Sequence, residues 1–184
     1  MADNVQYTIF KTKLGYFGLA ANEKGLFRTI LPCTTRKIAE NHLLAGLDKP
    51  QFEENLLKPL QNKIIAYFEG KPVSFDLPPL DRLPAFTQKV LAACGKIPSG
   101  KTISYSQLAR LIGSPRAGRA VGNALAKNPI PLIIPCHRVI RSNGSLGNFS
   151  APGGTGTKKK LLALESQAAA SRLTSREKLA CSAL

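Results

Sequence analysis

The sequence predicts a small α/β domain at the N-terminus, with an antiparallel sheet and helices, followed by a mainly helical C-terminal domain. Alternating apolar residues in segments between 5 and 31 are typical of β-strands, and apolar residues at helical spacing dominate the rest. A proline-rich segment at 77–84 coincides with a change in charge: residues 1–80 hold 10 Lys or Arg against 8 Asp or Glu, and residues 81–184 hold 16 against 3. We therefore place domains at 1–80 and 84–165 and interpret 166–184 as a C-terminal tail.

Composition excludes several classes of protein. With 184 residues, of which 43% are hydrophobic, the chain is long enough for a core and too apolar to be mainly disordered. No apolar run approaches the roughly 20 residues that span a bilayer. The first residues carry neither the basic nor the apolar part of a signal peptide. We therefore expect a cytoplasmic protein without a membrane partner.

The N-terminal domain is expected to hold three strands in a β-meander and then two helices. The strands are predicted at 5–9, 16–20 and 26–31. Ile38, His42 and Ala45 recur at the spacing of a first helix, and apolar residues between 56 and 68 mark a second helix, which Gly70 ends. We expect His42 to have a structural role.

The C-terminal domain is expected to consist of short helices. The buried positions of the first two are predicted to be Phe86, Val90, Cys94, Leu108, Leu111 and Ile112. Ser104 and Gln107 have the spacing of a capping box at the start of the second. Ser114 and Pro115 fit the N-cap and first turn of a third helix that runs to about Lys127. The last two helices form a candidate helix-turn-helix, with an ordinary helical corner inside a core as the alternative.

The third of these helices has a basic surface with small side chains. Arg116 and Arg119 are interleaved with alanines and glycines up to Gly122, so the backbone could approach a narrow groove closely. The stretch 82–164 carries thirteen basic residues and no acid, within a chain of net charge +15. This one-sided charge favours a polyanionic partner such as nucleic acid. A solvated basic surface and close packing of two helices remain the alternatives.

Cys136 and His137 follow an apolar, proline-rich segment at 130–135. A neighbouring histidine can favour the thiolate of a cysteine, although adjacent side chains in an extended chain point in opposite directions. A buried structural cysteine beside a chance histidine is the alternative. The remaining cysteines and the other histidine are far apart in sequence, so neither a zinc site nor a disulfide framework is predicted. Cys33 and Cys94 are expected to be core or half-buried thiols.

Four ordered segments resemble a known family. They are Gly100–Tyr105 (GKTISY), Ala117–Gly122 (AGRAVG), Asn128–Ile140, which ends in PCHRVI, and Leu161–Glu165 (LLALE). Together they closely resemble the methylated-DNA–protein-cysteine methyltransferases, or O6-alkylguanine-DNA alkyltransferases, which repair DNA. The resemblance covers residues 84–165 densely and the N-terminal part only in its general layout. It implies a ribonuclease H-like N-terminal domain and a winged helix-turn-helix-like element in the C-terminal domain.

The resemblance also implies roles for individual residues. Cys136 would accept the alkyl group, His137 would activate it through a bound water, and Glu165 would orient the histidine. Tyr105 would contact the phosphate beside the target nucleotide and lie near the flipped base, and Arg119 would fill the gap left in the duplex. Further implied residues are Asn128 in the turn before the active-site segment, Arg116, Ala120, Gly122 and Ser142 at the DNA, and Val139, Gly147 and Ser150 in the base pocket.

The implied reaction is the direct reversal of DNA damage by a stoichiometric reagent. After the base is flipped out of double-stranded DNA, a thiolate attacks the alkyl carbon of O6-alkylguanine, or of O4-alkylthymine, and guanine or thymine leaves. The product is a thioether that no nearby group can hydrolyse, so each molecule acts once. No cofactor and no metal are expected, and the protein is expected to be a monomer.

Two other functions remain open at this point. A non-enzymatic protein of the same fold could recognise alkylated bases, but the presence of Cys136 favours the enzyme. A helix-turn-helix regulator would need a dimerisation element, and we find none. The chain departs from the family at 151–160, which is about two residues longer than usual and contains Gly153 and Gly154. In this segment Lys158, Lys159 and Lys160 are expected to face solvent or phosphate.

Overall fold

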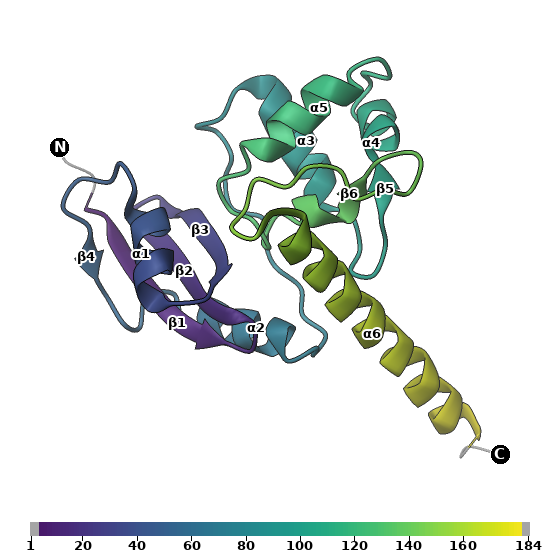
Figure 1. Cartoon of the computed structure of the whole chain (residues 1–184), viewed down its shortest axis with the longest axis horizontal. Coiled ribbons are helices and arrows are strands. Elements are labelled where there is room, and N and C mark those ends of the chain that lie inside the picture. Colours follow the sequence, from purple (N-terminus) through teal and green to yellow (C-terminus); the bar gives the residue numbers. More distant parts are fainter. Residues whose placement is uncertain (1–3, 182–184) are drawn as a thin grey trace.

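A four-stranded sheet forms the N-terminal part of the protein. The computed structural model describes residues 4–181, with side chains through residue 170. The strands are β1 (Gln6–Thr12), β2 (Gly15–Asn22), β3 (Gly25–Cys33) and β4 (Gln51–Phe52), in the order β3-β2-β1-β4 (Figure 1). The first three pair antiparallel, which confirms the predicted meander, and β4 pairs parallel with β1. A strand of two residues is too short to show alternation, so the sequence did not predict β4.

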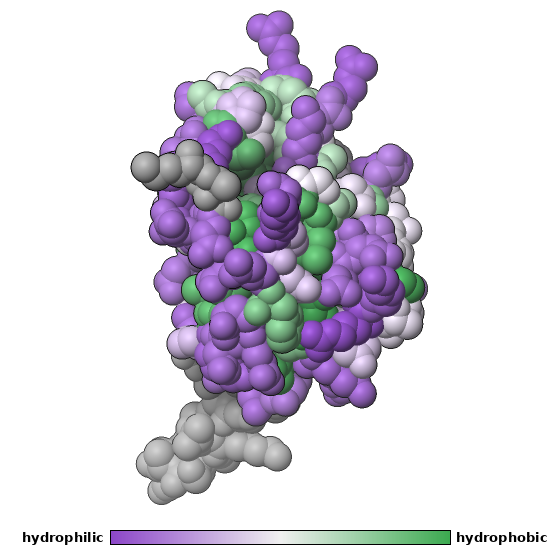
Figure 2. Space-filling model, turned by 90° about the vertical axis from the view of Figure 1, so that its left-hand side faces the viewer, coloured by the Kyte–Doolittle hydropathy of each residue, from purple (hydrophilic) through white to green (hydrophobic). Residues whose placement is uncertain are grey.

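Helix α1 (Arg36–Leu44) covers one face of this sheet (Figure 1). The predicted helix is present, but its buried residues are Ala39 and Leu43, whereas Ile38, one of the residues whose spacing indicated it, is 41% exposed. Gly18 of β2 explains the approach of Leu43, because a Cβ at Gly18 would lie only 2.9 Å from that side chain. Figure 2, which views the side where this domain lies, shows hydrophilic side chains over much of the face, with smaller hydrophobic areas between them. The apolar side of α1 therefore faces the sheet.

Helix α2 (Lys58–Phe68) belongs to the core on the other face of the sheet. Phe17 and Leu19 of β2 pack in one cluster with Ile64 and Phe68. The same cluster continues into the C-terminal part. Burial of each such apolar side chain stabilises the folded state by roughly 1.5–3 kcal/mol relative to leaving it exposed. The two predicted domains therefore share one hydrophobic core.

The C-terminal part is mainly helical, as predicted. Its elements are α3 (Ala85–Gly95), β5 (Ile103–Ser104), α4 (Tyr105–Leu111), α5 (Gly118–Ala126), the 3-10 turn η1 (Cys136–Arg138), β6 (Val139–Ile140) and α6 (Gly154–Cys181). Strands β5 and β6 form a short parallel pair. This pairing fixes the start of α4 beside the segment that carries Cys136.

The predictions for the ends and buried faces of α4 and α5 are only partly confirmed. The capping box of Ser104 and Gln107 is confirmed at the start of α4. Leu111, predicted to be buried, is 71% exposed, because this short helix turns Leu108 and its neighbour towards the core. Helix α5 begins at Gly118 and not at Pro115, since residues 114–117 form a separate turn.

Helix α6 changes the interpretation of the C-terminal end. It begins at Gly154, within the segment 151–160 where the chain departs from the family, and its backbone remains helical to Cys181. The predicted division between residues 165 and 166 therefore falls inside one helix, and the last three residues of the predicted tail lie outside the described residues. In the part of the chain that the structure describes, no helix is long and apolar enough to cross a membrane.

Candidate active site

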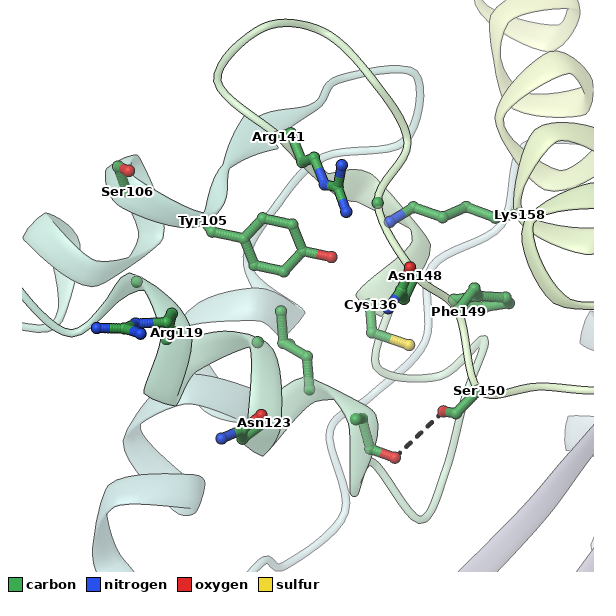
Figure 3. A pocket seen from close by; sticks show the side chains of 15 residues that line it. Tyr105, Ser106, Arg119, Asn123, Cys136, Arg141, Asn148, Phe149, Ser150 and Lys158 are labelled. Atoms are coloured by element: carbon green, nitrogen blue, oxygen red, sulfur yellow. Dashed lines mark hydrogen bonds between the residues drawn. The ribbon is translucent and has the colours of Figure 1, made fainter.

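A cavity of about 670 Å³ lies between α4, α5 and the loop that precedes α6 (Figure 3). The Tyr105 ring, the Cys136 thiol and the Lys158 side chain converge on it, whereas Arg119 points away from them. Its lining residues are Tyr105, Ser106, Gly118, Arg119, Gly122, Asn123, Leu125, Ala126, Cys136, Arg141, Gly147, Asn148, Phe149, Ser150 and Lys158. This volume is in the range of small-molecule sites.

Cys136 is held at this cavity by the turn that precedes it. The backbone at Cys136 forms the 3-10 turn η1 and is not extended as expected, and the residue is 8% exposed. Asn128 Nδ2 donates to the carbonyl of Ile134 (2.9 Å) and to Cys136 Sγ (3.3 Å), and Asn128 Oδ1 accepts from the amide of Ile130 (3.1 Å). Burial raises the pKa of the Cys136 thiol, while the hydrogen bond from Asn128 and the charge of Lys158 act in the opposite direction.

His137 is bound to a buried carboxylate. Its Nε2 lies 2.9 Å from Glu165 Oε1, and both side chains are buried. Burial alone would raise the pKa of Glu165, but hydrogen bonds from His137 and Arg138 outweigh it and hold that pKa well below its usual range. Glu165 is therefore ionised, so Nε2 carries the imidazole proton and donates a hydrogen bond to the carboxylate.

The other ring nitrogen of His137 is left with a free lone pair. Nδ1 is buried and has no hydrogen-bond partner within the described part of the chain. Burial lowers the pKa of His137 and outweighs the hydrogen bond and charge of Glu165, which act in the opposite direction, so the ring is neutral at pH 7. A neutral imidazole with an unpaired buried nitrogen is suited to accept a proton.

Arg138 completes the carboxylate site, although no role was predicted for it. Its Nε donates to Glu165 Oε2 (2.9 Å) and its Nη2 donates to Oε1 (2.8 Å). The amide of Gly100 also donates to Oε2 (3.1 Å), from a backbone at φ +76° that favours glycine. Arg138 follows Cys136 and His137 directly in the sequence, within a basic stretch that contains no acid. This position beside the predicted catalytic pair was the only sign in the sequence that Arg138 could belong to the site.

Lys158 lies inside the site and not in solvent, so the expectation for this lysine is wrong. It is 1% exposed, its Nζ donates to the carbonyl of Val139 (2.6 Å), and Nζ lies 5.8 Å from the ring centres of Tyr105 and Phe149. Burial lowers its pKa to about 8. Because α6 begins at Gly154, Lys158 falls on the same helical face as the buried Glu165. Its neighbours Lys159 and Lys160 are exposed, as predicted.

Only some of the residues expected at DNA or in the base pocket line the cavity. Those that line the cavity are Arg119, Gly122, Gly147, Ser150 and Tyr105, whereas Arg116, Ala120 and Ser142 are exposed outside its lining. Val139 is not a lining residue: its side chain is buried in the core. The Ser150 hydroxyl donates to the carbonyl of Ala126 (3.2 Å; Figure 3). Arg141, Asn148 and Phe149 line the cavity and were missed, because they belong to an irregular loop.

The remaining thiols and possible metal ligands lie elsewhere. Cys33 and Cys94 are buried free thiols, as predicted, and the side chain of Cys181 lies outside the described residues. His42 is exposed and lines a second cavity, which Cys136 also lines. Among the described residues, no group of three or more His, Cys, Asp or Glu could hold a metal ion.

Comparison with known proteins gives consistent matches along most of the chain. Residues 5–81 match the ribonuclease-like domain of 6-O-methylguanine DNA methyltransferase, and residues 85–167 match the DNA binding domain of the same family. A methylated-DNA–protein-cysteine methyltransferase of Cricetulus griseus is 38% identical over 175 residues, which is 88% of this chain and 82% of that protein. One from Methanosarcina acetivorans is 36% identical over 159 residues, covering 86% and 97%.

A solved structure agrees with these sequence matches. The crystal structure of Mycobacterium tuberculosis OGT in complex with DNA superposes with a TM-score of 0.74 at 32% identity, covering 89% of this chain and 94% of that one. Both domains, the sequence relatives and this fold lead to the same assignment. The chain belongs to the family of methylated-DNA–protein-cysteine methyltransferases.

Proposed function

We propose that the protein repairs O6-alkylguanine in double-stranded DNA by transferring the alkyl group to Cys136. One observation carries this assignment of the acceptor: Cys136 lines the cavity, and the adjacent His137 is bound to an ionised carboxylate with its second nitrogen unpaired. The family relation supports the class of substrate, since relatives of the chain are named for the transfer of a group from methylated DNA to a cysteine.

Activation of the thiol requires one proton transfer. His137 Nδ1 accepts the proton of the Cys136 thiol through a bound water, while Glu165 holds the proton on Nε2 and stabilises the resulting imidazolium. The thiolate is stabilised by the amide of Asn128 and by the nearby positive charge of Lys158.

The transfer itself is a displacement at the alkyl carbon. A bond forms between Cys136 Sγ and that carbon, the bond from the carbon to O6 breaks, and its electron pair remains on the guanine. A proton donor then neutralises the departing base. The Tyr105 hydroxyl lies in the cavity and is the candidate donor, and the proton that His137 took from the thiol returns to the phenol afterwards, so that neither group keeps a charge. The thioether product persists, and the protein acts once.

The target base must leave the duplex to reach the cavity. Flipping costs a few kcal/mol, less for a damaged pair, and a side chain that fills the gap stabilises the flipped state. Arg119 is the candidate for this role, because it is exposed on α5 at the cavity but points away from Cys136 (Figure 3). Arg116 is exposed, which makes it a candidate for a contact with phosphate.

The direct test is intact mass measurement after incubation with a duplex that contains O6-methylguanine. A gain of one methyl group that maps to Cys136 supports the proposal, and an identical duplex with guanine serves as the control. An unchanged mass together with tight binding of the damaged duplex would instead indicate a non-enzymatic recognition protein. A third duplex with O4-methylthymine tests the second substrate.

Replacing Arg119 with alanine should slow methyl transfer from duplex DNA much more than transfer from free O6-benzylguanine, which needs no flipping. We expect the transfer rate on the duplex to fall at least tenfold, which corresponds to the loss of about 1.4 kcal/mol of stabilisation of the flipped state. Arg116→Ala is the matched control, because it removes the same charge nearby and should weaken binding without this contrast. Equal slowing on both substrates by Arg119→Ala would contradict the role in flipping.

Replacing Lys158 with methionine should lower the transfer rate at pH 7 by about tenfold, because loss of a nearby positive charge raises the pKa of a thiol by about one unit or more. Methionine fills the buried site without a charge. The rate on free O6-benzylguanine should recover as the pH is raised, since more thiolate then forms. Lys159→Met, at the exposed neighbouring position, should leave the pH profile unchanged. A variant of Lys158 with the wild-type profile would remove this lysine from the mechanism.

A further inference from the structure

A tyrosine of the N-terminal domain contacts the carboxylate of the active site. The Tyr67 hydroxyl, on α2, donates to Glu165 Oε1 at 2.7 Å, across 98 positions of sequence. Both residues are buried. The steps derived above use only residues of the C-terminal part, so Tyr67 is a buried polar group that they leave without a role.

The oxygen that Tyr67 contacts is the one that binds the histidine. Oε1 accepts from Tyr67, from His137 Nε2 (2.9 Å) and from Arg138 Nη2 (2.8 Å). Oε2 accepts from the Gly100 amide, and Arg138 Nε donates to both oxygens, at 2.9 Å to Oε2 and 3.2 Å to Oε1. Donors that share one oxygen divide its negative charge. Tyr67 therefore reduces the charge that Oε1 presents to the imidazole.

The phenol is rigidly supported. The Tyr67 ring packs edge-on against Phe68, with ring centres 5.2 Å apart at 87°, and lies 6.1 Å from the ring of Phe75. It belongs to the hydrophobic core that the two halves of the chain share. Hydrogen bonds also join the two halves of the chain. The backbone amide of Thr29 donates to the carbonyl of Pro129 (3.0 Å), and the Thr29 hydroxyl donates to the carbonyl of Pro131 (2.8 Å). The hydroxyl is thus fixed relative to Glu165.

We propose that Tyr67 is a positioning residue for alkyl transfer, by which the N-terminal domain fixes the Glu165 carboxylate and sets the strength of its hold on His137. This inference rests on the proposed function. It gives the N-terminal domain a direct effect on the proton transfer that activates Cys136. The hydroxyl acts through the carboxylate and touches neither the thiol nor the cavity.

The expected effect of removing the hydroxyl has a definite sign. Without this donor, Oε1 carries more negative charge towards His137 and stabilises the imidazolium, which raises the pKa of His137. The other groups that interact electrostatically with His137 are Arg138 of η1 and Lys158 of α6. Further titratable groups packed in the site are the thiols of Cys136 and Cys94, on η1 and α3, and the phenol of Tyr105 on α4. All of these remain in the variant.

The test compares Tyr67→Phe with Tyr7→Phe. Both substitutions keep the ring and delete one hydroxyl that donates to a glutamate, since Tyr7 donates to Glu40 Oε1 at 2.8 Å in the N-terminal domain. Single-turnover rates on free O6-benzylguanine are measured against pH. For Tyr67→Phe we expect a loss of about fivefold at pH 7, because the carboxylate that orients His137 loses one of the hydrogen bonds that hold it in place. The acidic limb should shift upward by about half a pH unit, because His137 is then protonated at higher pH. Tyr7→Phe should match the wild type.

Imidazole NMR provides a second measurement that does not depend on the rate. The chain has only two histidines, His42 and His137, so their ring signals are easily assigned. In Tyr67→Phe the ring signals of His137 should titrate at higher pH than in the wild type. In the wild type, the Tyr67 hydroxyl proton should give a cross peak to the His137 Nε2 proton, a result that needs no variant.

The outcomes separate this inference from the proposed function. A lower melting temperature of Tyr67→Phe with a wild-type pH profile and wild-type His137 titration would mean that Tyr67 only supports the core, which overturns the inference. Absence of the cross peak in the wild type would overturn it as well. Failure of the wild type itself to gain a methyl group would instead refute the proposed function.

Discussion

Replacing Cys136 with serine is expected to abolish methyl transfer while leaving DNA binding nearly unchanged. A serine hydroxyl ionises far less readily than a thiol and is a poor nucleophile at neutral pH. Serine is similar in size, and its oxygen can still accept the hydrogen bond that Asn128 gives to the thiol. The exposed arginines of α5 and the turn before it are not affected. Intact mass after incubation with the damaged duplex measures transfer, and titration with labelled duplex measures affinity.

The matched control is Cys33→Ser. Cys33 is a buried free thiol in β3, remote from the cavity lining, and its Sγ donates to the carbonyl of Leu31 (3.5 Å), a bond that serine can also make. This variant should still gain one methyl group. Binding of both variants should weaken steeply with salt, since phosphate contacts release counterions. If Cys136→Ser still gains a methyl group, Cys136 is not the acceptor. If this variant loses DNA binding as well as transfer, Cys136 has a structural role.

The parts of the fold that the sequence predicted are those with local causes. The capping box at Ser104 and the strands of the meander depend on residues a few positions apart, and both are present in the structure. Errors arose where packing decides between local alternatives. Ser114 and Pro115 can start a helix, yet α5 starts at Gly118, and Ile38 has helical spacing, yet Leu43 is the residue that meets the sheet.

The candidate site was predicted unevenly for the same reason. The segment around Cys136 and His137 is contiguous, and its likeness to a family also singled out Asn128 and Glu165, which the structure places in hydrogen-bond contact with that segment. Lys158, Arg138 and Tyr67 were misjudged or missed. A lysine beside two exposed lysines carries no sign of burial, and a contact across 98 positions between Tyr67 and Glu165 exists only after the two halves pack together. Burial and long-range contact required the structure.

Replacing Glu165 with glutamine is expected to have the second largest effect, because it acts on both activity and stability. The carboxylate accepts hydrogen bonds from Tyr67, His137, Arg138 and the Gly100 amide. A glutamine has one acceptor oxygen and an NH₂ group, so at least one of these donors would face another donor. Arg138 would also lose its buried counter-charge, which costs about 3–5 kcal/mol for a buried pair. Urea unfolding at pH 7 should detect this loss.

The transfer rate of Glu165→Gln should fall by about 10²–10⁴, the usual contribution of positioned acid–base catalysis. Glutamine can accept from His137 Nε2 or donate to it, so the proton position on the ring is no longer fixed, and the imidazolium loses its anionic partner. Glu69→Gln is the control: it breaks an exposed pair with Lys71 (2.7 Å) and should change neither the rate nor, by more than about 1 kcal/mol, the stability. A normal rate in folded Glu165→Gln would exclude the carboxylate from catalysis.

The pH dependence of unfolding tests the cause of the stability loss in Glu165→Gln. The pKa of Glu165 lies below its usual range in the folded protein, so the unfolded chain binds a proton more readily at this group. Its stabilising contribution is therefore complete above the unfolded pKa of about 4.3. It is lost as the pH falls from there towards the folded value. The difference in unfolding free energy between the wild type and Glu165→Gln should accordingly be largest near pH 7 and shrink below about pH 4. A difference that stays constant down to acidic pH would mean that the shape of the side chain, and not its charge, holds Arg138 and His137 in place.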